Sequence, residues 1–146
     1  MKKYIIAAAF LLCVAASAHA SEVVVTKPVL KSFEKSFVQV SDVKWSVVKD
    51  CYQAEFMFDG KHLTALFTAE GVLIATVKNI SSLTLPQKLQ KKLRKNMHSM
   101  WITALVEVND EQGTRYLVTL ESAEEAIVME SVVNKKWTAV QYQVKS

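Results

Sequence analysis

The sequence predicts an α+β domain in which two amphipathic helices cover an antiparallel sheet. Two segments repeat apolar residues at the spacing of a helix, and other segments alternate apolar and polar residues as strands do. Several alternating segments follow one another through two-residue turns, which join antiparallel neighbours and cannot join parallel ones. The predicted order is a helix and four strands, followed by a second helix and four further strands.

The first helix is predicted over 28–39. Pro28 suits a first helical position, because the N–H that proline lacks needs no partner there. Val29, Phe33 and Phe37 recur at helical spacing and form an apolar face. Period-two alternation then predicts strands over 43–47, 52–58, 62–69 and 72–80.

The second half begins with a helix that starts at Pro86. Leu85, Leu89, Leu93 and Met97 form a stripe at four-residue spacing, with basic residues on the other side. The strands predicted after it are 101–108, 114–121, 125–132 and 136–144. The predicted core consists of aromatic and leucine side chains from both halves: Phe33, Phe37, Trp45, Tyr52, Phe56, Leu89, Leu93, Tyr116 and Trp137.

Trp45 has the sharpest prediction of this core set. It alternates with Val43 and Val47, and only a short connection separates its strand from the first helix. Helix and strand must therefore pack against each other. We expect the indole to lie buried beneath Phe33 and Phe37.

Residues 1–20 read as a secretory signal peptide. Lys2 and Lys3 precede an apolar run that is short for a membrane span, and 18–20 (Ala-His-Ala) supply the small residues of a cleavage site. Cleavage is predicted before Ser21, which leaves residues 21–146 as a single exported domain with no integral membrane segment. Leu12 argues against a lipoprotein, because lipobox processing needs a small residue at that position, before Cys13.

Export also changes the charge and cysteine content. Removal of Lys2 and Lys3 from the 18 basic residues leaves 16 against 14 acidic ones, a mild excess that gives no argument for nucleic-acid binding. Cys51 is then the one cysteine, so no internal disulfide can form. Cys51 stands at a strand start with no evident activator, and we expect it to be dispensable for function.

The two halves, 28–80 and 84–144, are candidates for an internal duplication. A shift of 64 positions aligns apolar residues such as Tyr52 with Tyr116, Leu73 with Trp137 and Ala75 with Ala139. Except for a last pair, Ile80 with Val144, these positions fall at period two and would share one face of the sheet. Two meanders that resemble each other by pattern alone would give the same match.

The search for catalytic or cofactor chemistry finds no candidate. His62 and His98 stand apart from Cys51 and from any metal-ligand spacing, and the three glycines fall at strand turns. The sequence therefore predicts no cofactor, no metal centre and no enzyme. The turn 109–113 carries oxygen ligands that leave weak calcium binding open, although a solvated hairpin turn is favoured.

Two groups of residues are candidates for partner binding. Leu66, Phe67 and Ile74 are apolar and lie off or beside the shared sheet face, where a partner or a second copy could cover them. Lys88, Lys92 and Lys95 belong to a cluster of five cations on the second helix, which suits an acidic partner or anionic lipid. A plain solvated helix face and burial by the chain's own helices are the alternatives.

An ordered series of short motifs resembles the PepSY-like family of small exported bacterial proteins, often assigned a β-lactamase-inhibitor-protein-like fold. The series is Phe33 and Phe37, 41–45, Tyr52-x-Ala54-x-Phe56, Asp59-Gly60, Ala65-x-Phe67, Glu70-Gly71, Thr76 and Leu85-Pro86. Two departures are Phe67, where a tyrosine is expected, and a missing turn glycine near Asn134. The resemblance covers nearly all of the exported chain.

The resemblance implies helices packed on an antiparallel sheet, a periplasmic or secreted location, and a binding role. PepSY-related modules are suspected of restraining proteases, and the namesake of the fold inhibits an enzyme with a concave sheet face. The expected function is therefore a non-catalytic exported binding module, an inhibitor or regulator of a periplasmic protein or protease. The alternative is a carrier of a small apolar ligand between helix and sheet, and a homodimer stays open.

Overall fold

The computed structural model describes residues 23–132 and 135–145. The predicted signal peptide, its cleavage before Ser21 and the turn residue Asn134 lie outside the described residues. Among the described residues, no helix is long and apolar enough to cross a membrane.

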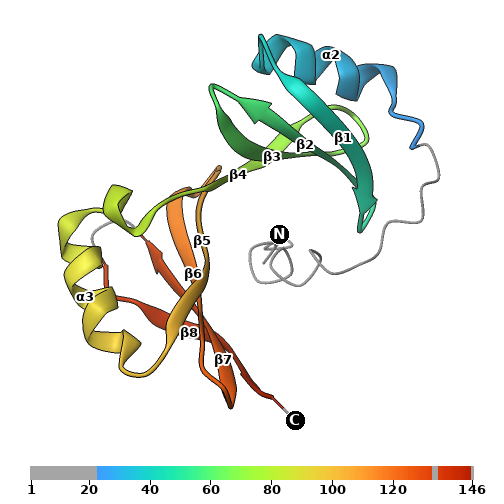
Figure 1. The fold of residues 1–146 in the computed structure, drawn as a ribbon. Coiled ribbons are helices and arrows are strands. Elements are labelled where there is room, and N and C mark those ends of the chain that lie inside the picture. Colours follow the sequence, from blue (N-terminus) through green and yellow to red (C-terminus); the bar gives the residue numbers. More distant parts are fainter. Residues whose placement is uncertain (1–22, 133–134, 146) are drawn as a thin grey trace.

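The described chain forms one antiparallel sheet of eight strands in which every strand pairs with its neighbours in sequence (Figure 1). The elements are α2 (Lys27–Ser36), β1 (Ser41–Val48), β2 (Cys51–Phe58), β3 (Lys61–Phe67), β4 (Leu73–Asn79), η2 (Ser82–Thr84), α3 (Gln87–Met97), β5 (Trp101–Asp110), β6 (Gly113–Glu121), β7 (Glu125–Val132) and β8 (Thr138–Val144). The predicted fold class, two helices on an antiparallel sheet, is confirmed.

Both helices cover the same face of this sheet. Ala54 pairs with Trp45 on one side and with Ala65 on the other, and directly paired residues point to the same face. The same cross-strand alternation, followed through β4 and β5, places Val118 on that face as well. The opposite face, here called the open face, has no helix over it in the described chain.

The first helix cluster lies beneath α2. Val29 and Phe33 from the helix pack on Ala54, Phe56 and Phe67 from the sheet, and all five are at most 6% exposed. The Phe33 and Phe56 rings meet edge to face with centroids 5.0 Å apart. This arrangement suits the aromatic quadrupole and fixes the angle of α2 on the sheet.

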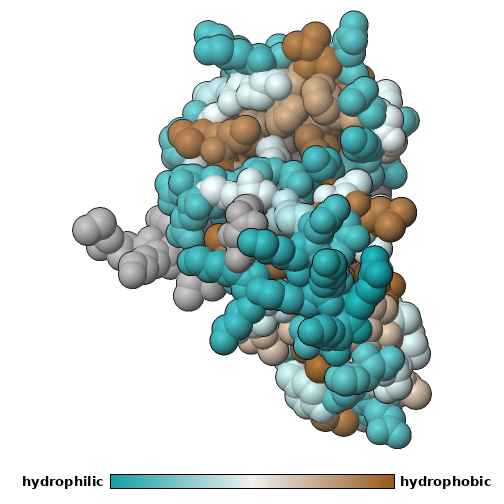
Figure 2. All heavy atoms as spheres, turned by 90° about the vertical axis from the view of Figure 1, so that its left-hand side faces the viewer, coloured by the Kyte–Doolittle hydropathy of each residue, from teal (hydrophilic) through white to brown (hydrophobic). Residues whose placement is uncertain are grey.

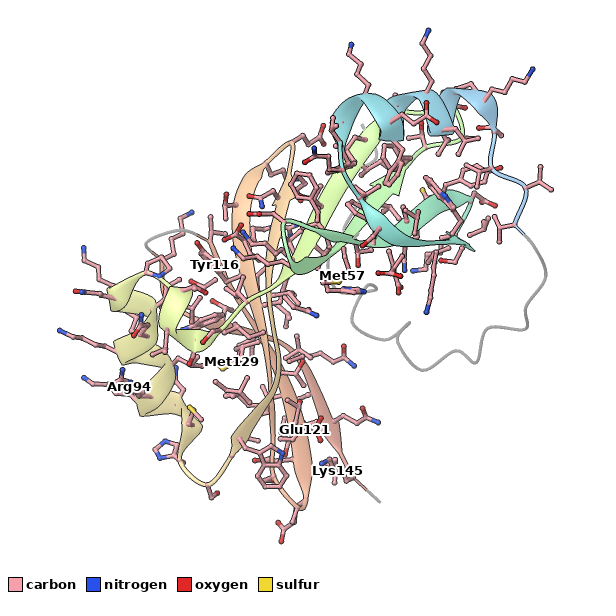
Figure 3. All side chains as sticks on the ribbon, turned by 45° about the horizontal axis from the view of Figure 1, so that its top comes forward. Met57, Arg94, Tyr116, Glu121, Met129 and Lys145 are labelled. Atoms are coloured by element: carbon pink, nitrogen blue, oxygen red, sulfur yellow. The ribbon has the colours of Figure 1, made fainter. Side chains whose placement is uncertain are left out.

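The second helix cluster lies beneath α3. Leu89 and Leu93 pack on Tyr116, Val118 and Trp137, together with other buried residues of β5 and β6. Figure 3 shows Tyr116 and Met129 on the sheet behind α3. The buried Trp137 Nε1 donates a hydrogen bond of 3.1 Å to the Leu89 carbonyl oxygen, which ties the start of β8 to the helix.

Several boundaries differ from the sequence prediction by a few residues, and two of the differences bear on the core. The helix predicted over 28–39 ends at Ser36, because Phe37 turns to an extended conformation (φ −131°) while its amide still bonds the Phe33 carbonyl. Phe37 nevertheless packs on Phe56, with ring centroids 4.8 Å apart. The last strand begins at Thr138, since the Trp137 side chain turns toward α3 before regular pairing starts.

Trp45 faces the first helix cluster and is half-buried, not buried. Its ring meets Phe33 edge to face at 5.1 Å and lies 6.2 Å from Phe67. The residue belongs to β1, which is an outer strand of the sheet, so one side of the indole has no neighbouring strand to cover it. The predicted orientation of the strand therefore holds, and the predicted depth of burial was too great.

The prediction that Leu73 and Ala75 of β4 share one face of the sheet is wrong. The register between β3 and β4 shifts beside Phe67, where a bulge lets Leu73 pair with Phe67 and Ala75 pair with Leu66. Leu73 thus lies on the helix side and Ala75 on the open face, because an extra residue reverses the alternation. The helix–strand order does occur twice, but two meanders with one helix each produce that order without common ancestry.

Candidate binding surface

The open face carries an apolar cluster of its own. Val106, Val108, Leu117 and Val128 are buried there, with Val77 packed against them. They come from β4 to β7, so this open-face cluster spans the junction between the two halves of the sheet. The two halves meet at an angle (Figure 1). A hollow of about 1320 Å³ lies on this side of the sheet.

The lining of this open-face hollow combines an apolar floor with acidic groups. Val77, Val106, Val108 and Leu117 belong to the floor. Five carboxylates also line it: Asp50, Glu55, Glu70, Asp110 and Glu111. A concave apolar floor with a few polar groups around it is the usual composition of a binding site.

Arg115 is the one lysine or arginine among the described residues that line the hollow, and its charge is already matched. One guanidinium nitrogen donates to Glu130 at 2.8 Å, and the other forms an ion pair with Asp110. The Arg115 side chain is 16% exposed, and its Nε has no hydrogen-bond partner. This network ties β5, β6 and β7 together and leaves the rest of the hollow with an acidic surplus.

Cys51 lies at the edge of the hollow as a half-buried free thiol. Partial burial raises the pKa of this thiol above its ordinary value, and the carboxylates of Asp50 and Glu70 raise it further. Burial and negative neighbours both disfavour the thiolate, which is the nucleophilic form. The environment of Cys51 is therefore the opposite of the one that activates a cysteine.

Neither His62 nor the turn 109–113, which carries calcium-type ligands, belongs to an assembled metal site in the described chain. Among the described residues, no group of three histidine, cysteine or acidic side chains is placed to hold a metal ion. Asn109 Oδ1 accepts a hydrogen bond of 2.6 Å from Thr114, and Asp110 Oδ1 accepts one of 2.8 Å from the Gln112 amide. The oxygens of this turn thus close the β5–β6 hairpin. His62 lies 4.0 Å from Glu55, with both side chains largely exposed.

The six predicted partner-binding residues do not form one surface. Phe67 is fully buried beneath α2, because alternation along β3 puts it on the same side as Ala65, and its assignment to partner binding is corrected to the core. Leu66 lies on the open face and is 3% exposed, and Ile74 lines the hollow. Lys88, Lys92 and Lys95 are exposed on α3, on the other side of the sheet.

Sequence reasoning missed the Arg115 network and the acidic lining of the hollow. A single arginine inside an otherwise apolar strand is a signal that could have marked the network, because an arginine in a sheet interior needs acidic partners. No sequence signal places Glu70 and Glu111 around one hollow. They belong to different turns that only the pairing of β4 with β5 brings together.

The space beside α3 is small compared with the open-face hollow. A hollow of about 130 Å³ is lined by Leu93, Arg94 and Met97 of the helix and Ile102 of the sheet, among other residues. Pockets for organic ligands usually measure about 300–1,000 Å³. This site is too small to support the alternative of a carrier with its ligand between helix and sheet.

Comparison with known proteins supports the fold. No family model matches the chain, and no curated protein matches it. A BLIP-like protein from Bacteroides fragilis is similar in structure with a TM-score of 0.69 at 15% identity, covering 84% of this chain and 87% of its own. A proposed periplasmic protein from Bacteroides eggerthii is similar with a TM-score of 0.75 at 11% identity, and the match covers 84% of this chain and 90% of that protein. A DUF2874 family protein from Bacteroides ovatus is similar with a TM-score of 0.74 at 12% identity, and the match covers 84% of this chain and 89% of that protein.

These similarities show a BLIP-like fold. They do not confirm the resemblance to the PepSY-like family. At sequence identities this low, structural similarity establishes the fold but not the role of any residue. The function therefore has to be inferred from the surface of this chain.

Proposed function

We propose that this protein is a non-catalytic exported binding module that holds a protein partner against the open face of its sheet. The observation that carries the proposal is the open-face hollow, with an apolar floor formed by the β4, β5 and β6 members of the open-face cluster and acidic groups around it. Its volume exceeds the usual size of a small-molecule pocket, and its lining, which runs across the strands from β2 to β6, suits a protruding segment of a protein.

The environment of the candidate reactive groups supports a binding role over a catalytic one. The Cys51 pKa is raised, and Arg115 is held by two carboxylates. A rigid, ion-paired surface keeps its shape on binding, which lowers the entropic cost of association. We further propose, from the resemblance and the fold, that the partner is a periplasmic protein, an enzyme such as a protease included, which the module restrains or regulates.

Affinity capture from periplasmic extract tests the proposal when it is combined with native mass spectrometry of the purified protein. Val72 lines the hollow and is 60% exposed, so Val72→Asp should remove the captured protein while the chain stays folded. Val38→Asp is the matched control, because Val38 is 68% exposed and does not line the hollow. It should retain the partner.

Three outcomes would contradict the proposal. A bound organic mass without a protein would favour the ligand carrier. Equal loss of the partner in both variants would move the contact away from the open face. A mass of twice the chain, lost in Val72→Asp, would make the occupant a second copy.

A further inference from the structure

The outer surface of α3 carries a dense and unmatched positive charge. The helix presents Lys88, Lys91, Lys92, Arg94 and Lys95, and all five are exposed. None of them forms an ion pair within the described part of the chain. No aspartate or glutamate occurs in the sequence from residue 71 to 106. Figure 2 looks onto α3 and shows hydrophilic side chains gathered over it.

This basic helix face costs the fold stability. Lys88 with Lys92 and Lys91 with Lys95 are like charges one helical turn apart, which repel each other. Lys88 also lies in the first turn, where the helix dipole favours acidic groups and α3 has none. The helix has no side-chain N-cap to offset this. Arg94 and Lys95 in the last turn match the helix dipole, so the dipole disfavours only the cation at the start of α3.

The body of the protein holds these cations outward in a fixed arrangement. Leu89 and Leu93 are at most 2% exposed against the sheet, and Trp137 bonds the helix backbone. Figure 3 shows Arg94 pointing away from the sheet. Because α3 covers the helix side of the sheet, the open face points in the opposite direction.

The chemistry of this face fits an anionic lipid surface. Four of the five cations are lysines, which act as point charges, whereas paired recognition of carboxylates or phosphates in a pocket favours arginine. Aromatic residues that stack on bases are absent from α3, which disfavours single-stranded nucleic acid. Leu83, 77% exposed, stands beside the helix and is held there by a 3.0 Å hydrogen bond from Gln90 to its carbonyl oxygen. The apolar face of α3 is already buried against the sheet, so attraction to anionic lipid is mainly electrostatic, and Leu83 adds one exposed apolar side chain.

We propose that α3 docks the exported protein on a membrane surface rich in anionic phospholipid. The five cations of the basic helix face meet the headgroups, and Leu83 enters the boundary between headgroups and acyl chains. The open face then points away from the membrane and stays accessible to a partner.

Sedimentation with vesicles tests this docking, using the exported chain purified from the periplasm. The chain should bind vesicles of equal parts phosphatidylglycerol and phosphatidylcholine, should not bind phosphatidylcholine alone, and should be released by salt. The double variant Lys88→Glu with Lys91→Glu should bind the mixed vesicles about thirtyfold more weakly or worse, since each cation near an anionic surface contributes roughly fivefold in affinity.

The same double variant separates docking from stability. Each new carboxylate lies one turn before Lys92 or Lys95, an arrangement that favours the helix, so the melting temperature should stay level or rise. The control is Lys31→Glu with Lys61→Glu, two exposed positions in the other half of the molecule with the same total change of charge. It should lose far less affinity than the α3 variant.

Several results would overturn the proposal. They are absent binding to the mixed vesicles, equal binding to phosphatidylcholine alone, and equal loss in the control variant. Binding to soluble polyglutamate as tight as to vesicles would replace the lipid surface with an acidic protein partner.

Discussion

Gly71 lies where the turn between β3 and β4 meets the start of α2. Its backbone has φ of +87°, and a Cβ there would stand 2.5 Å from the Pro28 carbonyl oxygen. The same turn is held by a 3.1 Å hydrogen bond from the Thr26 hydroxyl to the Ala69 carbonyl oxygen. A side chain at residue 71 would therefore push the helix away from the sheet.

Gly71→Ala should destabilise the protein by about 3 kcal/mol or more, from backbone strain and the clash together. Gly60→Ala is the matched control, because Gly60 has a similar φ of +70° and open space around its would-be Cβ. It should cost only about 1–2 kcal/mol. Urea unfolding measures both, and equal losses would mean that the contact with Pro28 relaxes freely.

The Cys51 thiol should react slowly and at unusually high pH. Because burial and the carboxylates of Asp50 and Glu70 raise its pKa, less thiolate exists in the folded chain than in the unfolded one. The pH midpoint of iodoacetamide alkylation should lie above that of the same chain in urea. Asp50→Asn should move the folded midpoint part of the way down. A folded midpoint below the unfolded one would instead indicate an activated cysteine.

At the scale of elements, Trp45 links the first strand to the first helix. Its ring contacts Phe33 and Phe67 while part of it stays in solvent. Trp45→Ala should cost about 2–3 kcal/mol, on the low side for an aromatic residue because burial is incomplete. Trp101→Ala is the control, because Trp101 is 51% exposed. It should lower the free energy of unfolding by less than about 1 kcal/mol. Thermal melting of the two variants compares them directly, and similar losses would contradict the packing role of Trp45.

The sequence predicted the elements well because their signals are local. Asp59-Gly60 and Glu70-Gly71 mark the turns, and alternation marks the strands between them. The faces of β4 were predicted less well, since the bulge beside Phe67 arises from pairing between strands and leaves no local pattern. That bulge decides which side of the sheet Leu73 and Ala75 face.

The binding surface could not be predicted from local sequence patterns, for a related reason. Ala75 and Asp110 face each other across β4 and β5, although a whole helix separates them in the chain. The open-face hollow depends on this pairing and on the angle between the two halves. Periodicity carries information on which residues share a face within one strand, and none on how two halves of a sheet meet.

At the scale of the whole molecule, the core is divided where the sequence predicted a single one. The first and second helix clusters are separate, and each helix covers one of them. The junction between halves consists of the pairing of β4 with β5, the bond from the Ile80 amide to the Leu105 carbonyl oxygen at 3.1 Å, and the open-face cluster. We expect this junction to make the two halves unfold as one unit, because its apolar side chains come from both.

Val118→Ala tests this cooperativity, since Val118 is fully buried in the second helix cluster and its loss should cost about 2 kcal/mol. Two tryptophan reporters follow the halves separately. In the first reporter chain, Trp101 and Trp137 are changed to Phe, so that Trp45 is the one tryptophan. In the second, Trp45 and Trp101 are changed to Phe, so that Trp137 is the one tryptophan. If the halves are coupled, Val118→Ala lowers the urea midpoint of each reporter chain by the same amount, because loss of the second cluster removes the support of the first. A shift confined to the Trp137 reporter would show that the junction is too weak to transmit the loss, and that the chain consists of two folding units on one continuous sheet.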